Sequence, residues 1–190
     1  MRITKEVTAP TLPFTIVRCS NETAPYHFAG ISSDSGDRCN GLPWIVPVIT
    51  KPLYLTHRLP IQLDLKREPI LKGMADYSIE GLTDHIAIER KSVSDLYSTI
   101  GGRRYDFKCE IARLNMLPFS AVVIEGDWSR ILLDPPAQSQ MEPKNIARTI
   151  LSWSIRFPRV HWFTCSDRRH AELLTFQLLR QFWKQHYEKQ

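Results

Sequence analysis

The segment that most constrains the fold is DHIAIERKSVSDL, residues 84–96, where an alternating apolar pattern ends in three adjacent charged residues. Side chains alternate between the two faces of a strand, so Glu89 and Lys91 should lie on one face and Arg90 on the other. Directly after these charges, apolar residues no longer recur at every second position but at every third or fourth, as in a helix. The chain must therefore contain a strand whose charged end leads at once into a helix.

Strand and helix patterns alternate along most of the chain. Ser92 and Asp95 have the spacing of a capping box, and the helix that they begin should end at Gly101-Gly102. The same reasoning predicts strands at 14–17, 61–65, 77–79, 85–91, 119–126 and 160–164, and helices at 92–102, around Phe107, Ile111 and Leu114 up to Pro118, from Pro143 to Pro158, and at 167–187. This order predicts an α/β fold, a mixed β-sheet flanked by helices.

Residues 30–60 interrupt this alternation. Turn-forming residues in GISSDSGDRCNG and the prolines of LPWIVPVITKP predict a long irregular insert with room for one edge strand. With 190 residues, of which 43% are hydrophobic, the chain can bury one good core. We therefore expect a single domain over residues 1–190 with an insert at about 30–60.

Several classes of protein are excluded by the sequence. It has no apolar run of about 18 residues, so we expect no membrane span. The N-terminus lacks the pattern of a signal peptide, and we expect an intracellular protein, cytoplasmic or, in a eukaryotic cell, nuclear. The cysteines have no zinc-site spacing and are interpreted as reduced thiols: Cys19, Cys39, Cys109 and Cys165. The net charge of +5 is compatible with a polyanionic partner such as nucleic acid.

Glu89 and Lys91, with one more carboxylate, would form a set of groups suited to phosphodiester hydrolysis. Asp76 lies in the preceding strand of an expected hairpin, which would bring it beside Glu89. Two carboxylates and a main-chain carbonyl, that of Arg90, are hard oxygen ligands for Mg²⁺, which polarises a phosphate and acidifies a bound water. Lys91 would orient or deprotonate that water, or neutralise charge on the phosphoryl oxygens. Such a spacing often occurs by chance, and by itself it favours a solvated strand end with an ordinary ion pair over a nuclease site.

The longer string resembles the nuclease domain of the XPF/MUS family of structure-specific endonucleases, which includes the archaeal Hef proteins. The resemblance rests on DYS, IERKSVSDLYSTIGGRR and AVVIEG, and it spans roughly residues 14–165 apart from the insert. The family signature is Gly-Asp, a variable gap, then Glu-Arg-Lys, three residues and Asp. The matching positions are Asp76, Glu89, Arg90, Lys91 and Asp95, with Arg104 matching an arginine after the next helix.

The resemblance implies a restriction-endonuclease-like fold and cleavage of DNA that is branched or contains junctions between single and double strands, in repair, recombination or phage DNA processing. It implies a divalent metal, Mg²⁺ or Mn²⁺, held by Asp76 and Glu89. It also implies a homodimer, because family nuclease domains pair through their C-terminal helices. The helix predicted at 167–187 carries two apolar stripes, and the second would face another subunit or cover the insert.

The sequence departs from the family pattern at three places. In the upstream segment CSNETAPYHF, Cys19 stands where the family has Asp and Asn21 where it has Arg, and only Glu22 is kept. Ala75 replaces the glycine of Gly-Asp, and we find no helix-hairpin-helix module. A DNA-binding or regulatory subunit with weak or no cleavage is therefore the alternative, and a purely structural dimer partner is a third. The intact Glu-x-Lys set favours the enzyme.

Further residues around this set have two possible roles. Asp95 fits a helix cap and an active site equally well. Arg90 could pair with Asp95 or Glu22 to hold the site, which we favour over a phosphate contact. Glu125 is either a third acid or only a strand terminus. The basic residues after the glycine pair are candidate DNA contacts, as opposed to a solvated helix start: Arg103, Arg104 and Lys108.

Overall fold

The structure is a computed structural model of the chain, and it describes residues 8–32, 42–53 and 75–187. The strand predicted at 61–65, parts of the insert and Cys39 lie outside these ranges. Cys19, Cys109 and Cys165 are free and buried, which agrees with their interpretation as reduced thiols.

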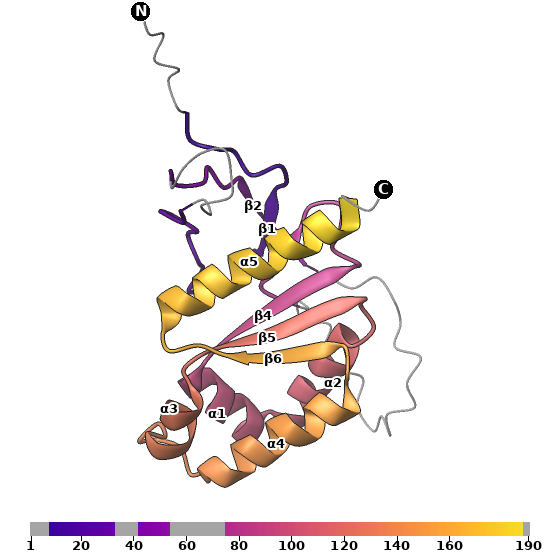
Figure 1. The fold of residues 1–190 in the computed structure, drawn as a ribbon. Helices are drawn as coiled ribbons and strands as arrows, with labels where there is room; N and C mark the ends of the chain where they lie inside the picture. The colour runs from indigo at the N-terminus through magenta and orange to yellow at the C-terminus, as the bar shows by residue number, and fades with distance from the viewer. Residues whose placement is uncertain (1–7, 33–41, 54–74, 188–190) are drawn as a thin grey trace, which may run out of the picture.

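A six-stranded mixed sheet forms the centre of the fold, in the order β2-β1-β3-β4-β5-β6 (Figure 1). Pairing is antiparallel between β1 and β3 and between β3 and β4, and parallel elsewhere. The central strand β4 therefore joins an antiparallel half of the sheet to a parallel half. The strands are β1 Ile16–Cys19, β2 Val48–Lys51, β3 Tyr77–Ile79, β4 Ile86–Ser92, β5 Phe119–Glu125 and β6 Val160–Thr164. The predicted mixed sheet is confirmed.

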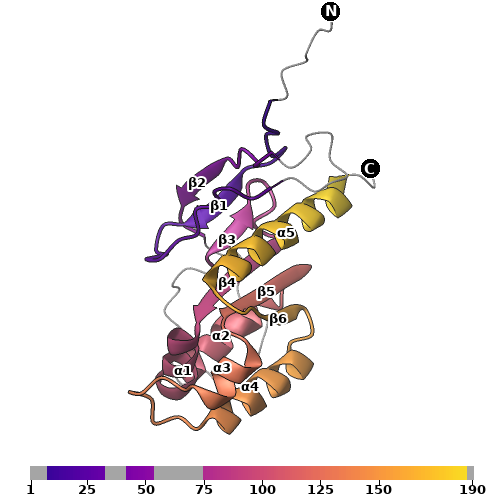
Figure 2. The same ribbon diagram turned by 60° about the vertical axis from the view of Figure 1, so that its left-hand side comes forward.

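Helices cover both faces of this sheet. The long helix α5 crosses one face, and the other helices lie against the opposite face (Figures 1 and 2). They are α1 Val93–Gly102, α2 Arg104–Leu114, α3 Trp128–Leu133, α4 Pro143–Arg156 and α5 Arg168–Tyr187. In the described part of the chain, no helix combines the length and the apolar character needed to cross a bilayer.

The two faces of β4 contribute to two different cores. Ala87 packs with α1, α2 and α4, whereas Ile86 and Ile88 pack with α5. Neighbouring β5 alternates in the same way, with Val122 on the first face and Val123 on the second. The alternation predicted for β4 is therefore confirmed, and it directs the side chains at the charged strand end to opposite faces.

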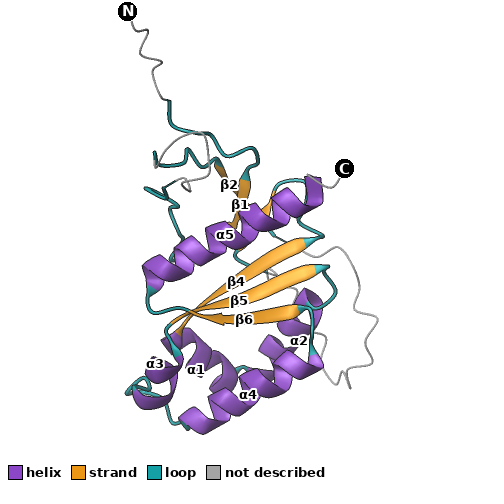
Figure 3. Ribbon diagram, viewed as in Figure 1, coloured by secondary structure: helices purple, strands orange, loops and turns teal. Residues whose placement is uncertain are grey.

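The capping prediction is also confirmed. Ser92 is the N-cap of α1, and its Oγ accepts the N–H of Asp95 at 3.1 Å. Two features differ from the prediction (Figure 3). The strand expected at 14–17 lies two residues later, because its limits are set by pairing with β2 and β3. The helix α3 was not predicted, because six residues are too few to show a helical period.

The insert and α5 contact one another. Strand β2, inside the predicted insert, is an edge strand as expected. Trp44 of the insert joins the core beneath α5, and the guanidinium of Arg180 lies 5.1 Å from its ring centroid. On the second apolar stripe, Phe176 is fully buried and Trp183 stacks on Phe14 at 5.7 Å. Of the two roles considered for this stripe, the structure shows contact within the chain.

Candidate active site

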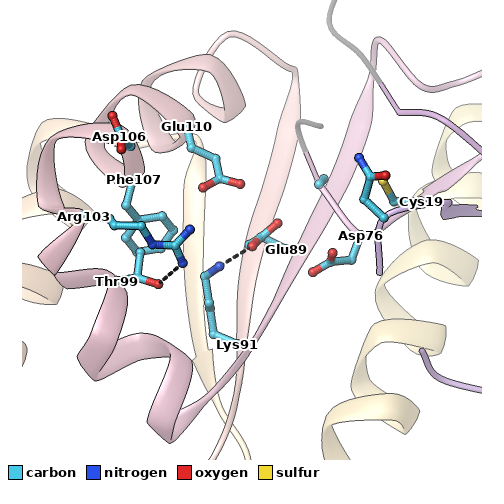
Figure 4. A pocket seen from close by; sticks show the side chains of 11 residues that line it. Cys19, Asp76, Glu89, Lys91, Thr99, Arg103, Asp106, Phe107 and Glu110 are labelled. Atoms are coloured by element: carbon cyan, nitrogen blue, oxygen red, sulfur yellow. Dashed lines mark hydrogen bonds and ion pairs between the residues drawn. The ribbon is translucent and has the colours of Figure 1, made fainter. Parts of the chain in front are cut away.

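A pocket of about 530 Å³ opens beside the end of β4, on the sheet face that carries α1 and α2. One wall consists of the ends of β1 and β4 and the residues just before β3, and the other consists of α2 and the end of α1 (Figure 4). Asp76, Glu89 and Lys91 all line it. The structure thus brings together the three residues that the sequence suggested for hydrolysis.

Glu89 and Lys91 form a buried ion pair in this pocket. Their Oε1 and Nζ atoms are 2.6 Å apart, and the side chains are only 6% and 12% exposed. Burial lowers the pKa of Lys91, but the negative charges of Glu89 and Glu110 outweigh it and hold the pKa above its ordinary value. Lys91 is therefore a cation and cannot accept a proton in this state.

Asp76 is held beside Glu89 by the hairpin of β3 and β4. Its Oδ2 accepts the backbone N–H of Arg90 at 2.7 Å, and its own N–H donates to the carbonyl of Ile88 at 3.0 Å. Burial, followed by the charges of Glu89 and Glu22, raises the pKa of Asp76 well above its ordinary range. A cation bound next to Asp76 would therefore stabilise the ionised form of its carboxylate.

The pocket contains a further acid that sequence reasoning missed. Glu110 of α2 lines it, and its carboxylate points toward Glu89 (Figure 4). Burial, and then the charge of Glu89, raises the pKa of Glu110 to about 8. A signal was available, because Glu110 lies three residues after Phe107 and therefore near the inward face of the predicted helix.

The donor set fits a hard divalent cation. Asp76 and Glu89 offer carboxylate oxygens, and their crowding leaves negative charge that a cation would offset. Within the described ranges, no three His, Cys, Asp or Glu side chains are arranged to hold an ion together. The protein would supply two carboxylates and a main-chain carbonyl, and water the remaining ligands, as is usual for Mg²⁺.

Arg90 lies on the opposite face of the sheet from the pocket. Its Nε and Nη2 donate to the two carboxylate oxygens of Glu125 at 2.7 and 2.8 Å, and its Nη1 lies 3.5 Å from Glu22. Arg168 at the start of α5 adds a second cation, with Nη1 2.8 Å from Glu125. The predicted pairing of Arg90 with Glu22 is observed. Glu125 joins this network, and neither Glu22 nor Glu125 lines the pocket.

Asp95 lies outside the pocket, at the exposed start of α1. Besides the N–H contact described above, the Ser92 hydroxyl donates to Asp95 Oδ2 at 2.7 Å. Of the two roles considered for Asp95, the structure shows the helix cap. The pairing with Arg90 that we considered is not formed.

The three candidate DNA contacts, one just before α2 and two on it, are placed differently from one another. Arg103 lines the pocket, and its Nη2 lies 3.4 Å from Thr99 Oγ1. Arg104 turns to α4, where its Nη1 donates to Thr149 Oγ1 at 2.6 Å and its guanidinium lies 5.2 Å from the ring centroid of Trp153. Lys108 is half-buried and does not line the pocket.

Comparison of the sequence with protein-family models gives one match. Residues 48–178 match the ERCC4 domain. A search of curated proteins finds no relative of significant similarity.

Two solved structures have a similar fold. XPF from Aeropyrum pernix superposes with a TM-score of 0.54 over 91% of this chain and 61% of its own length, at 17% sequence identity. XPF from the same organism in complex with DNA gives a TM-score of 0.55 over 90% and 66%, again at 17% identity. The chain therefore spans about two thirds or less of the proteins that it matches. The restriction-endonuclease-like α/β fold is confirmed by this similarity.

Proposed function

Because this chain belongs to the ERCC4 domain family, we propose that it is a divalent-metal-dependent endonuclease that hydrolyses phosphodiester bonds in DNA. The observation that carries the proposal is the joint presence of Asp76, Glu89 and Lys91 in one pocket at a strand end. The structural similarity to an XPF complex with DNA supports DNA as the substrate. We propose branched or junction-containing DNA as the preferred form, and repair, recombination or phage DNA processing as its setting.

Each residue of the pocket has a role in this proposal. Asp76 and Glu89 would hold Mg²⁺ or Mn²⁺ together with the main-chain carbonyl of Arg90. The cation would polarise the scissile phosphate and lower the pKa of a bound water. Lys91, kept cationic by Glu89 at 2.6 Å, would orient that water and offset the negative charge that develops on the phosphoryl oxygens.

Two groups outside this set would serve it indirectly. Arg103 at the rim would contact the DNA phosphates. Arg90 would hold the end of β4 from the other face of the sheet, through Glu125 and Glu22. Because the backbone N–H of Arg90 donates to Asp76, a fixed position for this residue also fixes the first carboxylate.

The alternative is a DNA-binding or regulatory subunit that cleaves weakly or not at all. It is favoured by the β1 side of the pocket, where Cys19 and Asn21 line the wall and neither supplies a carboxylate. The intact ion pair of Glu89 and Lys91 favours the enzyme, because a subunit without cleavage has no chemical need for it.

We also propose that the protein is a homodimer located inside the cell. The C-terminal helix α5 would form the contact, because its apolar side chains Leu173 and Tyr187 are 38% and 47% exposed. The proposed substrate, DNA, supports the location inside the cell. A monomeric mass by light scattering at micromolar concentration would contradict the dimer.

Cleavage assays separate the enzyme from its alternative. Purified protein is incubated with flap, fork and linear DNA in the presence of Mg²⁺, Mn²⁺ or EDTA. Cleavage of the branched forms that EDTA abolishes and the Glu89→Gln variant lacks would support the endonuclease. Metal-independent binding of the same DNA without cleavage would support the regulatory subunit.

A further inference from the structure

We propose that Glu110 supplies the third acidic group for the divalent cation of this pocket, in place of the carboxylate that is missing at Cys19. This inference rests on the proposed function and adds to it a residue from α2. The metal site would then span the sheet and a helix, instead of lying on the sheet alone.

The position of Glu110 is the first observation. It projects from α2 into the pocket, and its carboxylate points toward Glu89, with Asp76 on the far side of Glu89 (Figure 4). Phe107, one helical turn earlier, lies in the same wall. The three carboxylates thus form a row that runs from the start of β3 to α2.

The second observation is that Glu110 has no direct partner. Among the described residues, none forms a hydrogen bond or ion pair with its carboxylate, although it is half-buried. Lys91 is already paired with Glu89 at 2.6 Å, and Arg103 lies near Thr99. Burial and the charge of Glu89 raise the pKa of Glu110 to about 8, and they outweigh Lys91, Arg113 and Arg103, which lie near enough to lower it. An acid that points into a pocket under these conditions is best explained by a cationic ligand.

The β1 wall of the pocket, opposite α2, supplies no acidic group, so a third acid must come from elsewhere. Cys19 is 4% exposed and packs with Val17 and Leu53, and its neutral thiol is a poor partner for a hard cation. Asn21 completes this wall with an amide. Negative charge is thus absent on the β1 side and present on the α2 side.

Glu110 would act through water molecules bound to the cation. In the described structure, no three acidic side chains are arranged to ligate one ion directly. Mg²⁺ keeps several of its waters in proteins, and these can donate hydrogen bonds to a carboxylate beyond the first ligands. Loss of such an outer partner typically weakens metal binding by about 10- to 100-fold.

Direct measurement of Mn²⁺ binding tests this role without relying on cleavage. Free Mn²⁺ is followed by its electron paramagnetic resonance signal during titration of the metal-free protein. We expect Glu110→Gln to raise the Kd for Mn²⁺ by at least about 10-fold. Glu142→Gln is the matched control, because Glu142 pairs with Lys144 on the exposed start of α4 and should leave the Kd unchanged.

The remaining variants separate failure of this inference from failure of the proposed function. Asp76→Asn should abolish binding that the wild type shows. If Asp76→Asn does so while Glu110→Gln binds Mn²⁺ like the wild type, the role of Glu110 is refuted and the nuclease proposal stands. If the wild type binds no Mn²⁺, both proposals fall.

A melting experiment excludes a fold defect as the cause. Without metal, Glu110→Gln should melt at the same temperature as the wild type or higher, because glutamine needs no proton to be buried whereas folding forces the glutamate to take one up. With saturating Mn²⁺, its gain in Tm should be smaller than that of the wild type. An equal gain would contradict the inference.

Discussion

The carboxylate of Glu89 and the ammonium group of Lys91 are 2.6 Å apart, although their residues are two positions apart on the same face of β4. Both side chains are almost completely buried, so the pair is held in one arrangement before any ligand arrives. This pairing raises the pKa of Lys91 and keeps it cationic, which suits it to a phosphate.

Three substitutions test the pocket as a unit. Asp76→Asn, Glu89→Gln and Lys91→Ala should each reduce DNA cleavage by about 100-fold or more, as removal of a single stabilising group in an active site commonly does. Their effects should not add in double variants, because the three groups act together. Single-turnover cleavage gives the rates, and circular dichroism checks the fold. Cleavage near the wild-type rate by any one variant would refute the assigned site.

Arg103 and Arg104 should respond differently to replacement by alanine, although they are neighbours. Arg103→Ala should weaken binding to all DNA sequences and reduce the slope of log K against log salt by about 1, because one phosphate contact is lost. Arg104→Ala should leave the slope unchanged and lower the free energy of unfolding by about 1 kcal/mol, because it loses contacts to Thr149 and Trp153. Equal salt slopes in both variants would contradict this division.

The network around Glu125 should contribute strongly to stability. Arg90→Leu should lower the free energy of unfolding by about 3 kcal/mol or more, because it leaves the carboxylates of Glu125 and Glu22 buried with one cation fewer. Arg168→Ala should cost about 1 kcal/mol or less, because that side chain is 43% exposed. Urea unfolding measures the free energy of unfolding of both variants. A similar decrease in the two would show that burial of the arginine does not determine how much it stabilises the fold.

The stability of the metal-free protein should fall as the pH rises toward 8. The pKa of Glu110 is raised from 4.5 to about 8 in the folded state, so the folded protein binds a proton that the unfolded chain has released. Stability from this group is complete below about pH 4.5 and is lost as the pH approaches 8, by at most about 1.4 kcal/mol per pH unit.

The Glu110→Gln variant isolates this effect. Relative to the wild type, its free energy of unfolding should increase steadily between pH 5 and 8 and then level off. Urea titrations in EDTA at several pH values provide the measurement. A constant difference across this range would mean that Glu110 titrates normally.

Cys19→Asp tests the departure at the end of β1. If Cys19 adjoins the cation, the new carboxylate should lower the Mg²⁺ concentration needed for half-maximal cleavage, and the wild type should work better with Mn²⁺ than with Mg²⁺. If Cys19 acts only as a core residue with Val17 and Leu53, aspartate should destabilise the fold by several kcal/mol. A metal titration and a thermal melt on this variant distinguish the two results. A large fall in Tm with no gain in metal response would refute the role at the metal.

Much of the fold follows from local patterns in the sequence. The hairpin of β3 and β4, the cap at Ser92 and the start of α4 at Pro143 were all predicted correctly, because each depends on residues close together in the chain. The short helix α3 was missed, because its cap at Asp127 is followed by too few residues to show a period.

The candidate site could be predicted only in part. Asp76, Glu89 and Lys91 were found because one hairpin positions them all. Glu110 was missed because it reaches the pocket only when α2 packs against the sheet. Arg168 was missed for the same reason, since it meets Glu125 across 43 residues. Contacts of this kind depend on tertiary packing, and the spacing of Glu110 from Phe107 indicates only which face of the helix it shares.

The aromatic side chains behind the pocket give the protein an internal optical reporter. Phe107 lines the pocket, and its ring centroid lies 5.6 Å from that of Trp153 and 6.2 Å from that of Trp162. Trp183 belongs to α5 on the other face of the sheet, where it is stacked on Phe14. Because Lys91 lies 5.0 Å over Phe107, a cation bound in the pocket is expected to alter the emission of Trp153 and Trp162 and to leave that of Trp183 unaltered. Tryptophan fluorescence can thus follow occupancy of the pocket in real time, without an attached dye.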